Sequence, residues 1–401
     1  MSTVVFFNVP AHCHVNPTLP LVAELIQRGE RVIYYAQENF RLLIEQSGAS
    51  FRAYGDAYPF DHDRLDENIF KVVNQMMKAS WLILEKLQDE IKEIQPDYII
   101  HDSLCPWGLY FAELLGIPSI RSIVIFAINM RMALSVPEQY VEHVGMLFPA
   151  WKDVIEIITM EIRISQKYHV GRYINCMDTL QNVGPMKILY ASRELQPFAN
   201  AFDDTYKFIG YPVLPRTHVP AFPFERLSDK PLLYISLGTI YNDHLEFYRL
   251  CFEAFKQSDW QVVMSVGSKV QVESLEPIPD NFIVQNVVPQ LDILQRASLF
   301  LSAGGSSSIK EACNYGVPLI IVPHASDQQW VAGRIEQLGA GKRIRKQRVT
   351  AVRLRKLADE IVANPCYAQT SQKIGEALRD VGGYTYAVDE IQKLKQAFAV
   401  G

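Results

Sequence analysis

The sequence predicts an α/β protein with two doubly wound domains, and three observations lead to that prediction. The chain has 401 residues, too many for one ordinary hydrophobic core. Short β-branched or aromatic runs alternate with longer helical patterns in both halves, as in parallel sheets covered by helices. Between the halves, residues 210–231 are rich in proline and have no helical period. We therefore expect domains over residues 1–209 and 231–382, with a linker over 210–230.

Each predicted strand is a short apolar run followed by a turn and a helical segment. The runs in the first half are TVVFFNV from Thr3, RVIYYA from Arg31, DYIIHD from Asp97, SIRSIVIF from Ser119 and MKILYAS from Met186. Those in the second half are PLLYISLG from Pro231, WQVVMSV from Trp260, NFIVQNV from Asn281, SLFLSAG from Ser298 and VPLIIVP from Val317. A long helix is expected over 66–94, and a last helix over 383–401 is expected to pack back toward the first domain.

Composition and charge exclude several classes of protein. A net charge of −5 argues against nucleic acid or an anionic membrane as the main partner. The one basic stretch, from Gly341 to Lys356, fits a solvated surface that spans a strand end and a helix. No apolar run approaches the roughly 18 residues of a membrane span, and the scattered cysteines suit a reducing compartment. We expect a cytoplasmic monomer or weak homodimer.

The stretch SAGGSSSIKEA, from Ser302 to Ala312, lies between a strand pattern and a helical pattern. Gly304 and Gly305 allow a tight turn and the close approach of a ligand to the backbone. A serine is expected to cap a helix that begins near Ser308, whose free N–H groups and dipole attract an anion, above all a phosphate. Taken alone, the segment favours a plain strand-to-helix turn capped by serine.

Other segments at the carboxyl ends of predicted strands add possible ligand contacts. A Gly-Thr pair stands at residues 238–239, and the stretch VVPQLDIL begins at Val287. Asp327 and Gln328 stand at the start of a helix, where they can bind vicinal hydroxyls or cap the helix. Open α/β sheets bind ligands at this edge, so these groups with Glu311 predict a nucleotide-sugar site in a cleft between the domains.

The segments VVPQLDIL, SAGGSSSIKEACNYGVPLIIVP and DQQ resemble the donor signature of the inverting UDP-glycosyltransferases of the GT-B fold. The likeness is greatest to the bacterial macrolide glycosyltransferases, which also modify flavonoids and other natural products. It covers nearly the whole chain, including VPAHCHVNPTLPL near the start. The resemblance implies two Rossmann-like domains facing across a cleft, and transfer of a hexose, above all glucose, to a hydroxyl of a bulky apolar acceptor.

The resemblance also implies which residues bind the donor. The nucleoside is assigned to Gln290 and Glu311, the diphosphate to Ser308 with the amides of Gly304 and Gly305, and the sugar to Asp327 with Gln328. The predicted donor-binding residues also include Gly238, Thr239, Val287, Val288 and Ser306. The sequence departs from the family at Ala303, where His usually touches the diphosphate, and at Val287, where Trp often stacks on the base. Either a UDP-sugar or a TDP-sugar therefore fits as co-substrate, with no bound cofactor.

A histidine follows the first predicted strand and supplies a candidate base. His14 lies in PAHCHVNP, and Asp102 ends the strand DYIIHD. An imidazole can take a proton from an attacking hydroxyl near neutral pH, and a carboxylate can orient it. In the resembling family this His is the general base and this Asp its partner, although Cys13 stands where that family has Gly. A lone His is more often structural, but the pair at two strand ends favours catalysis.

Metal sites are not expected. His12, Cys13 and His14 are too few for a zinc site without a second cluster of ligands. Asp61 to Asp63 mimic the Asp-x-Asp of metal-dependent glycosyltransferases but lie in a polar stretch that fits a solvated loop better.

Large, adaptable side chains in the first half are candidates for the acceptor pocket. They are Phe60, Met76, Trp81, Trp107, Phe126 and Met130. The same residues suit a hydrophobic core.

The mechanism that this sequence predicts is one in-line displacement with inversion, without a metal. Three rivals remain open. A nicotinamide-dependent dehydrogenase is disfavoured because no G-x-G-x-x-G follows a strand. A nucleotide-sugar epimerase would need acid–base pairs around the sugar. A non-catalytic sugar-nucleotide or natural-product binding protein would explain Ala303 and Val287, but His14 and Asp102 argue against it.

Overall fold

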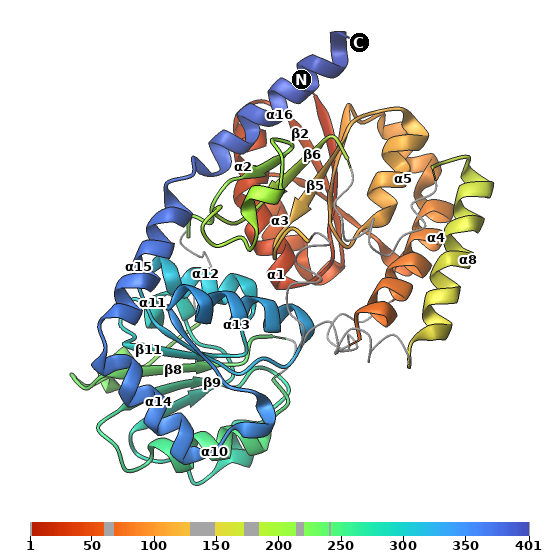
Figure 1. Ribbon diagram of the computed structural model, residues 1–401. Coiled ribbons are helices and arrows are strands. Elements are labelled where there is room, and N and C mark those ends of the chain that lie inside the picture. Colours follow the sequence, from red (N-terminus) through yellow and green to blue (C-terminus); the bar gives the residue numbers. More distant parts are fainter. Residues whose placement is uncertain are drawn as a thin grey trace. The chain divides into compact units, whose positions relative to one another are not determined.

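The computed structural model describes residues 2–59, 68–128, 149–171, 184–213, 220–239 and 242–400 of the chain. By its internal contacts the chain divides into two units. Unit 1 consists of Met1–Gly210 with Val381–Gly401, and unit 2 consists of Tyr211–Asp380. Each unit has its own parallel sheet with helices on both faces (Figure 1). The α/β, doubly wound architecture predicted from the sequence is confirmed.

Unit 1 is built on a seven-stranded parallel sheet in the order β3-β2-β1-β4-β5-β6-β7. Its strands are β1 (Thr3–Phe7), β2 (Arg31–Ala36), β3 (Ser50–Ala53), β4 (Tyr98–Asp102), β5 (Ser119–Ile123), β6 (Met186–Leu189) and β7 (Tyr206–Phe208). The residues of β4, β5 and β6 are all buried, as expected for strands covered on both faces.

Helices cover both faces of this sheet. They are α1 (His12–Val15), α2 (Leu19–Gln27), α3 (Arg41–Gln46), α4 (Ile69–Ile94), α5 (Pro106–Leu115), α8 (Trp151–Tyr168) and α16 (Gly383–Val400). Figure 1 shows α4, α5 and α8 together on one side, where α4 packs against both of the others. The long helix predicted to end at Ile94 does so. Several residues singled out in the sequence, Phe60, Asp61 to Asp63 and Met130, lie outside the described residues.

The C-terminal helix α16 belongs to unit 1 although it follows unit 2 in the chain. It packs against α2 and buries Ala387, Val388 and Ile391 (Figure 1). Ion pairs add to this contact: Lys395 Nζ lies 2.6 Å from Glu30 Oε1, and Lys207 Nζ lies 2.6 Å from Glu390 Oε2.

Unit 2 contains a six-stranded parallel sheet in the order β10-β9-β8-β11-β12-β13. Its strands are β8 (Leu232–Ser236), β9 (Gln261–Ser265), β10 (Phe282–Gln285), β11 (Leu299–Ser302), β12 (Leu319–Ile321) and β13 (Gly341–Arg343). Its helices are α10 (Leu245–Phe255), α11 (Gln290–Leu294), α12 (Ser306–Asn314), α13 (Ser326–Leu338), α14 (Ala351–Ala363) and α15 (Cys366–Arg379). In Figure 1, α10 and α14 lie on one face of the sheet, and α12 and α13 lie on the other.

The strand order of unit 2 reverses between β8 and β11. The chain runs outward from β8 through β9 to β10, then returns to place β11 on the other side of β8. A crevice forms at such a switch point outside the carboxyl ends of the strands, and doubly wound proteins bind ligands there.

The ten strands predicted from apolar runs are all present, but the prediction missed β3, β7 and β13. All three lie at an edge of their sheet. An edge strand needs little apolar sequence, because one side faces no neighbour: β3 reads SFRA and β13 reads GKR. The basic stretch that begins at Gly341 does contain a strand and a helix, β13 and α14.

Candidate functional site

The first cluster of polar groups lies at the carboxyl ends of β1 and β4, which are neighbours in the sheet of unit 1. His14 lies in α1, directly after β1, and Asp102 is the last residue of β4. The Nδ1 atom of His14 lies 2.7 Å from Oδ2 of Asp102, and both side chains are buried. The two residues paired in the prediction therefore do meet, in hydrogen-bonding geometry.

Neighbouring groups hold this pair in place. The backbone N–H of Leu104 donates to Asp102 Oδ1 at 2.8 Å, and Asn8 Nδ2 donates to the His14 carbonyl at 3.0 Å. Helix α5 packs closely on β4, and only glycine fits at the contact: a Cβ added at Gly108 would lie 2.3 Å from Cβ of His101. Because the carboxylate accepts from Nδ1–H, Nε2 is the basic atom of neutral His14.

Burial and charge act in opposite directions on His14. Burial is the largest single effect and disfavours the imidazolium, but the Asp102 carboxylate and the neighbouring Cys13 together outweigh it, and the pKa of His14 rises well above its usual value. A buried imidazole beside a carboxylate is a strong proton acceptor.

A second cluster of polar groups lies in unit 2 and joins α11 to α12. Gln290 Nε2 donates to Glu311 Oε2 at 2.6 Å and to Ser308 Oγ at 3.3 Å. Tyr234 of β8 donates its hydroxyl to Gln290 Oε1 at 3.0 Å. The structure thus brings together Gln290, Ser308 and Glu311, three of the predicted donor residues, at the carboxyl edge of the sheet.

The glycine-rich turn between β11 and α12 differs in one detail from the prediction. Helix α12 begins at Ser306 rather than near Ser308, and its N-cap is Gly305, with no side-chain cap. The expected serine cap is wrong, because the helix starts early enough to place Ser306 to Ser308 inside its first turn. Ser302 Oγ instead accepts from the N–H of Gly304 within the turn, at 3.1 Å. Glycine at the N-cap position thus gives α12 no side-chain cap of its own, as suits an anion-binding turn.

Gly304 is required by the geometry of this turn. Its φ is +96°, and a Cβ there would lie 2.8 Å from Ile321 Cγ2 and 3.3 Å from the Gln328 carbonyl oxygen. Nothing lies within 4 Å of a Cβ at Gly305. The two glycines therefore have different roles. Gly304 lets the turn pack against β12 and α13, whereas Gly305 leaves open space beside the start of α12.

Two further turns line the same edge of the sheet. After β8, Gly238 has a φ of +85° and is exposed, like Thr239. Asn242 Nδ2 donates to the carbonyls of both residues, at 2.9 and 3.2 Å. At the start of α13, Gln328 Oε1 accepts from the N–H groups of His324 and Ala325, at 2.8 and 3.1 Å. The capping alternative is thus realised by Gln328, whereas Asp327 is partly exposed in the first turn.

The two departures from the family signature differ in environment. Val287 is 58% exposed, so its side chain contributes little to the core, while Val288 beside it is buried. Ala303 is buried in the hydrophobic core of unit 2. No side chain at residues 303–305 can donate a hydrogen bond.

Comparison with known proteins decides the family. A family model described as the C-terminal domain of erythromycin biosynthesis protein CIII-like proteins matches residues 249–380. An uncharacterised UDP-glucosyltransferase, YojK of Bacillus subtilis (strain 168), is 31% identical over 401 residues, which cover 98% of this chain and 97% of YojK. The demethyllactenocin mycarosyltransferase of Streptomyces fradiae is 30% identical, over 98% of this chain and 87% of its own length.

The chain is a natural-product glycosyltransferase. Its fold is GT-B: the crystal structure of the glycotransferase of kitacinnamycin matches with a TM-score of 0.84 and 27% identity, over 98% of each chain.

The acceptor candidates of this glycosyltransferase lie in two environments. Met76 and Trp107 are buried in the core of unit 1, where Trp107 packs edge-on against Tyr54 and Tyr58. Trp81 is partly exposed, with the Lys167 ammonium 4.5 Å from its ring centroid. Phe126 is buried, and Phe60 and Met130 lie outside the described residues. That these residues bind an acceptor stays a prediction.

Sequence reasoning missed Asn8, Tyr234, Asn242 and His324. Asn8 has a readable signal, because it is a buried polar residue that directly follows the apolar run of β1. Tyr234 has no such signal, because the sequence pattern of a buried strand does not distinguish it from a core residue. Only the structure shows that its hydroxyl donates to Gln290.

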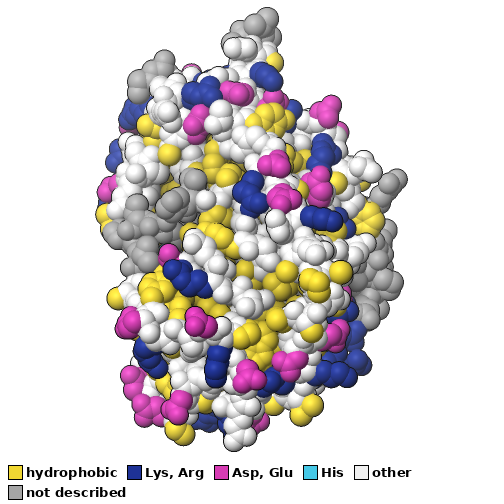
Figure 2. All heavy atoms as spheres, turned by 90° about the vertical axis from the view of Figure 1, so that its left-hand side faces the viewer, with side chains coloured by type: hydrophobic (Ala, Val, Ile, Leu, Met, Phe, Trp, Pro, Cys, Tyr) yellow, Lys and Arg dark blue, Asp and Glu magenta, His cyan; other side chains and the backbone are white. Residues whose placement is uncertain are grey.

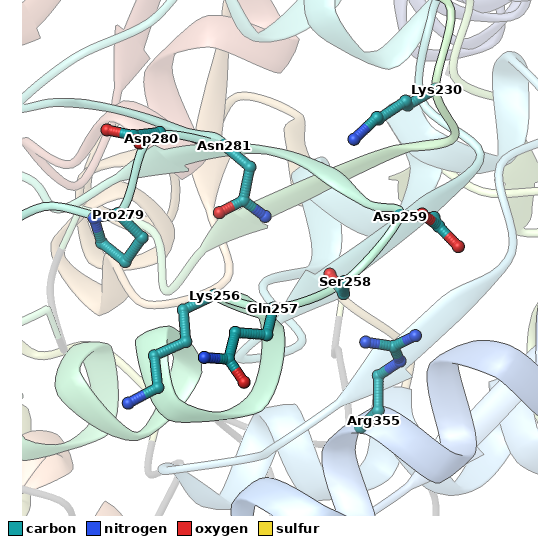
Figure 3. Close-up of a pocket in the computed structure, with 9 residues that line it drawn as sticks. All are labelled: Lys230, Lys256, Gln257, Ser258, Asp259, Pro279, Asp280, Asn281 and Arg355. Carbon is teal, nitrogen blue, oxygen red and sulfur yellow. The ribbon is translucent and has the colours of Figure 1, made fainter.

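A polar surface pocket of the glycosyltransferase lies at the other edge of the unit 2 sheet (Figure 3). Its lining residues Lys230, Asp259 and Asn281 come just before β8, β9 and β10, at the amino ends of the strands. The Asn281 side chain has a structural role, since its Nδ2 donates to the carbonyls of Phe255 and Trp260, both at 2.9 Å. This pocket is separate from the carboxyl-edge clusters.

Within the described residues, no three His, Cys, Asp or Glu side chains gather as metal ligands would. No helix in the described part of the chain is both long and apolar enough to cross a membrane. On the face in Figure 2, the described Lys and Arg side chains are interspersed with Asp and Glu.

Proposed function

We propose that this glycosyltransferase moves a hexose, above all glucose, from a uridine or thymidine diphosphate sugar to a hydroxyl of a bulky apolar natural product. The name of the YojK relative supports a UDP-sugar and glucose. The macrolide context of the family match and of the mycarosyltransferase supports a natural-product acceptor. The observation that carries the chemistry is the buried contact of 2.7 Å between His14 and Asp102.

In the proposed reaction, Nε2 of His14 takes the proton of the acceptor hydroxyl while that oxygen attacks the anomeric carbon. The bond from the anomeric carbon to the diphosphate breaks in the same step, so the configuration inverts. Asp102 keeps Nδ1 as a donor and stabilises the imidazolium that forms.

The donor is proposed to bind at the carboxyl edge of unit 2. Gln290 and Glu311 bind the nucleoside, where the existing hydrogen bond between them sets the positions of both side chains. Ser308, the amide of Gly305 and the neighbouring Thr239 bind the diphosphate, whereas the Gly304 N–H, predicted to join them, already donates to Ser302 Oγ. The α12 dipole and the Gly305 amide stabilise the charge that grows on the leaving group, so no metal is required. Asp327 and the Gln328 amide bind sugar hydroxyls.

The first prediction tests the base. His14→Ala should lower the rate of sugar transfer by a factor of about 100 to 10,000, because general-base catalysis is lost. Binding of the nucleoside diphosphate should stay within a few fold, since His14 belongs to unit 1. The measurement is turnover with UDP- and TDP-glucose and a panel of macrolide and flavonoid acceptors.

His12→Ala is the matched control, because His12 is an exposed residue of the same short helix, with its ring against Phe40. Its turnover should equal that of the unchanged enzyme. Full turnover in the His14 variant would refute the assignment of the base.

The second prediction tests the donor. A nucleoside diphosphate at about a hundred times its dissociation constant should stabilise the fold by roughly 2.7 kcal/mol. Thermal unfolding with UDP, TDP, GDP and NAD measures this. A shift confined to UDP or TDP identifies the donor base, whereas equal behaviour of all four would count against a nucleotide-sugar site.

A further inference from the structure

His324 is a buried histidine whose ring packs against other rings, while its nitrogens stay without hydrogen bonds in the described part of the chain. It is 9% exposed and follows β12 by three residues. Neither Nδ1 nor Nε2 has a hydrogen-bond partner among the described residues. Buried polar groups without partners are rare in native proteins and call for an explanation, and a missing ligand is one.

The position of His324 connects it to the glycine-rich turn. Its backbone N–H donates to Gln328 Oε1 at 2.8 Å. The same Gln328 lies against Gly304, where a Cβ would come within 3.5 Å of the Gln328 Cβ. Gln328 thus contacts both the backbone of the turn that carries His324 and the glycine-rich turn before α12.

The imidazole of His324 packs against that of His244. The two rings stack with centroids 4.4 Å apart and planes 23° apart. His244 precedes α10 after strand β8, and His324 follows β12; β8 and β12 both flank β11 in the sheet. Rings from the two flanking strands that touch each other therefore lie near the carboxyl end of β11, at the switch point.

The turn after β11 lacks what His324 carries. Residues 303–305 are Ala-Gly-Gly and offer only backbone N–H groups. Burial first, then the neighbouring His244 and Lys346, lower the pKa of His324 to about 3, so the ring is neutral at physiological pH. A neutral imidazole has one N–H to donate, and an anion bound at the α12 amides is the acceptor that this edge of the sheet is built to receive.

We propose that His324 is a donor-binding residue whose ring N–H hydrogen-bonds a phosphate oxygen of the nucleoside diphosphate, with His244 as its positioning residue. This inference rests on the proposed function, because it assumes a nucleoside diphosphate at the carboxyl edge of unit 2. It adds a side-chain contact that the turn after β11 cannot supply.

The test compares ligands with and without phosphates. Isothermal titration calorimetry measures the affinity of the full chain for UDP, TDP and the matching nucleosides. His324→Phe keeps a ring to stack on His244 and removes the N–H. It should weaken binding of the preferred diphosphate about tenfold or more, because a hydrogen bond to a charged acceptor is lost, and leave the nucleoside unchanged. His324→Gln, which keeps an N–H donor, should retain part of the affinity for the diphosphate.

Each result has a defined meaning. Unchanged diphosphate affinity in His324→Phe overturns the inference, and so does an equal loss for diphosphate and nucleoside, which would show an effect on the fold. If His324→Phe fails to fold, the ratio of diphosphate to nucleoside affinity in His324→Gln decides in the same way. Failure of the unchanged protein to bind either diphosphate would refute the proposed function instead.

Discussion

At the scale of the residue, the environment of His14 determines what its imidazole can do. Burial would by itself keep the ring neutral, whereas the Asp102 carboxylate at 2.7 Å and the neighbouring Cys13 together favour the protonated form and prevail. The base of the proposed reaction must be neutral to accept a proton. The free enzyme is therefore active only in the fraction of molecules whose His14 is deprotonated.

The third prediction follows from this sign. kcat/KM should rise with pH through the elevated pKa of His14, because raising the pH produces the neutral base. Asp102→Asn removes the charge that raises the pKa, so its ascending limb should lie at lower pH. Its plateau should fall by a factor of about 100 to 10,000, since the orienting carboxylate is gone. The measurement is a pH–rate profile of both enzymes, and an ascending limb at the same pH in each would contradict it.

At the scale of the element, the turn from β11 to α12 combines a strained position with an open one. Gly304 has a positive φ and close neighbours in Ile321 and Gln328, while Gly305 has a φ of −58° and empty space around its Cβ position. The sequence pattern shows only two adjacent glycines and does not reveal that one is conformationally strained and closely packed while the other is open. The difference comes from the packing of the turn against β12 and α13.

This contrast yields the fourth prediction. Gly304→Ala should lower the free energy of unfolding by about 1–3 kcal/mol, because a side chain is forced into a left-handed conformation and a steric clash. Gly305→Ala is the matched control and should change it by less than about 0.5 kcal/mol. Chemical denaturation of both variants measures the difference, and equal stabilities would show that the turn relaxes freely.

At the scale of the whole molecule, the chain leaves unit 1, forms unit 2 and returns as α16. The last helix completes unit 1 through Val388, Ile391 and the ion pair between Lys395 and Glu30. The stability of the first unit therefore depends on residues at the far end of the chain.

The fifth prediction tests this dependence. Ile391→Ala should destabilise the protein by about 2–4 kcal/mol, because a fully buried side chain leaves a cavity between α16 and the rest of unit 1. Phe398→Ala on the same helix should cost less than about 0.5 kcal/mol, since Phe398 is 50% exposed. Equal costs in denaturant titrations would mean that α16 does not contribute to the core.

Much of the fold was predictable, and the strands that the prediction missed share one cause. Strands such as β4 and β11 lie inside parallel sheets, so both faces need apolar residues and the run is visible in the sequence. The missed strands β3, β7 and β13 are edges, where pairing on one side suffices and polar residues are tolerated. The prediction of a serine cap failed because serine and glycine are both favoured at the N-cap of a helix. Only the backbone path of the turn selects Gly305.

The sequence alone determined the doubly wound architecture, the glycine-rich turn, the likeness to macrolide glycosyltransferases, and His14 and Asp102 as candidates, because local periodicity and motif spacing encode these features. Tertiary structure alone decided that Gln290 bonds Glu311 and Ser308, that Gln328 caps its own turn, and that His324 is buried with its ring nitrogens unpartnered among the described residues. Those contacts depend on strand order and packing, which bring together residues that are distant in the chain, and no local pattern specifies them.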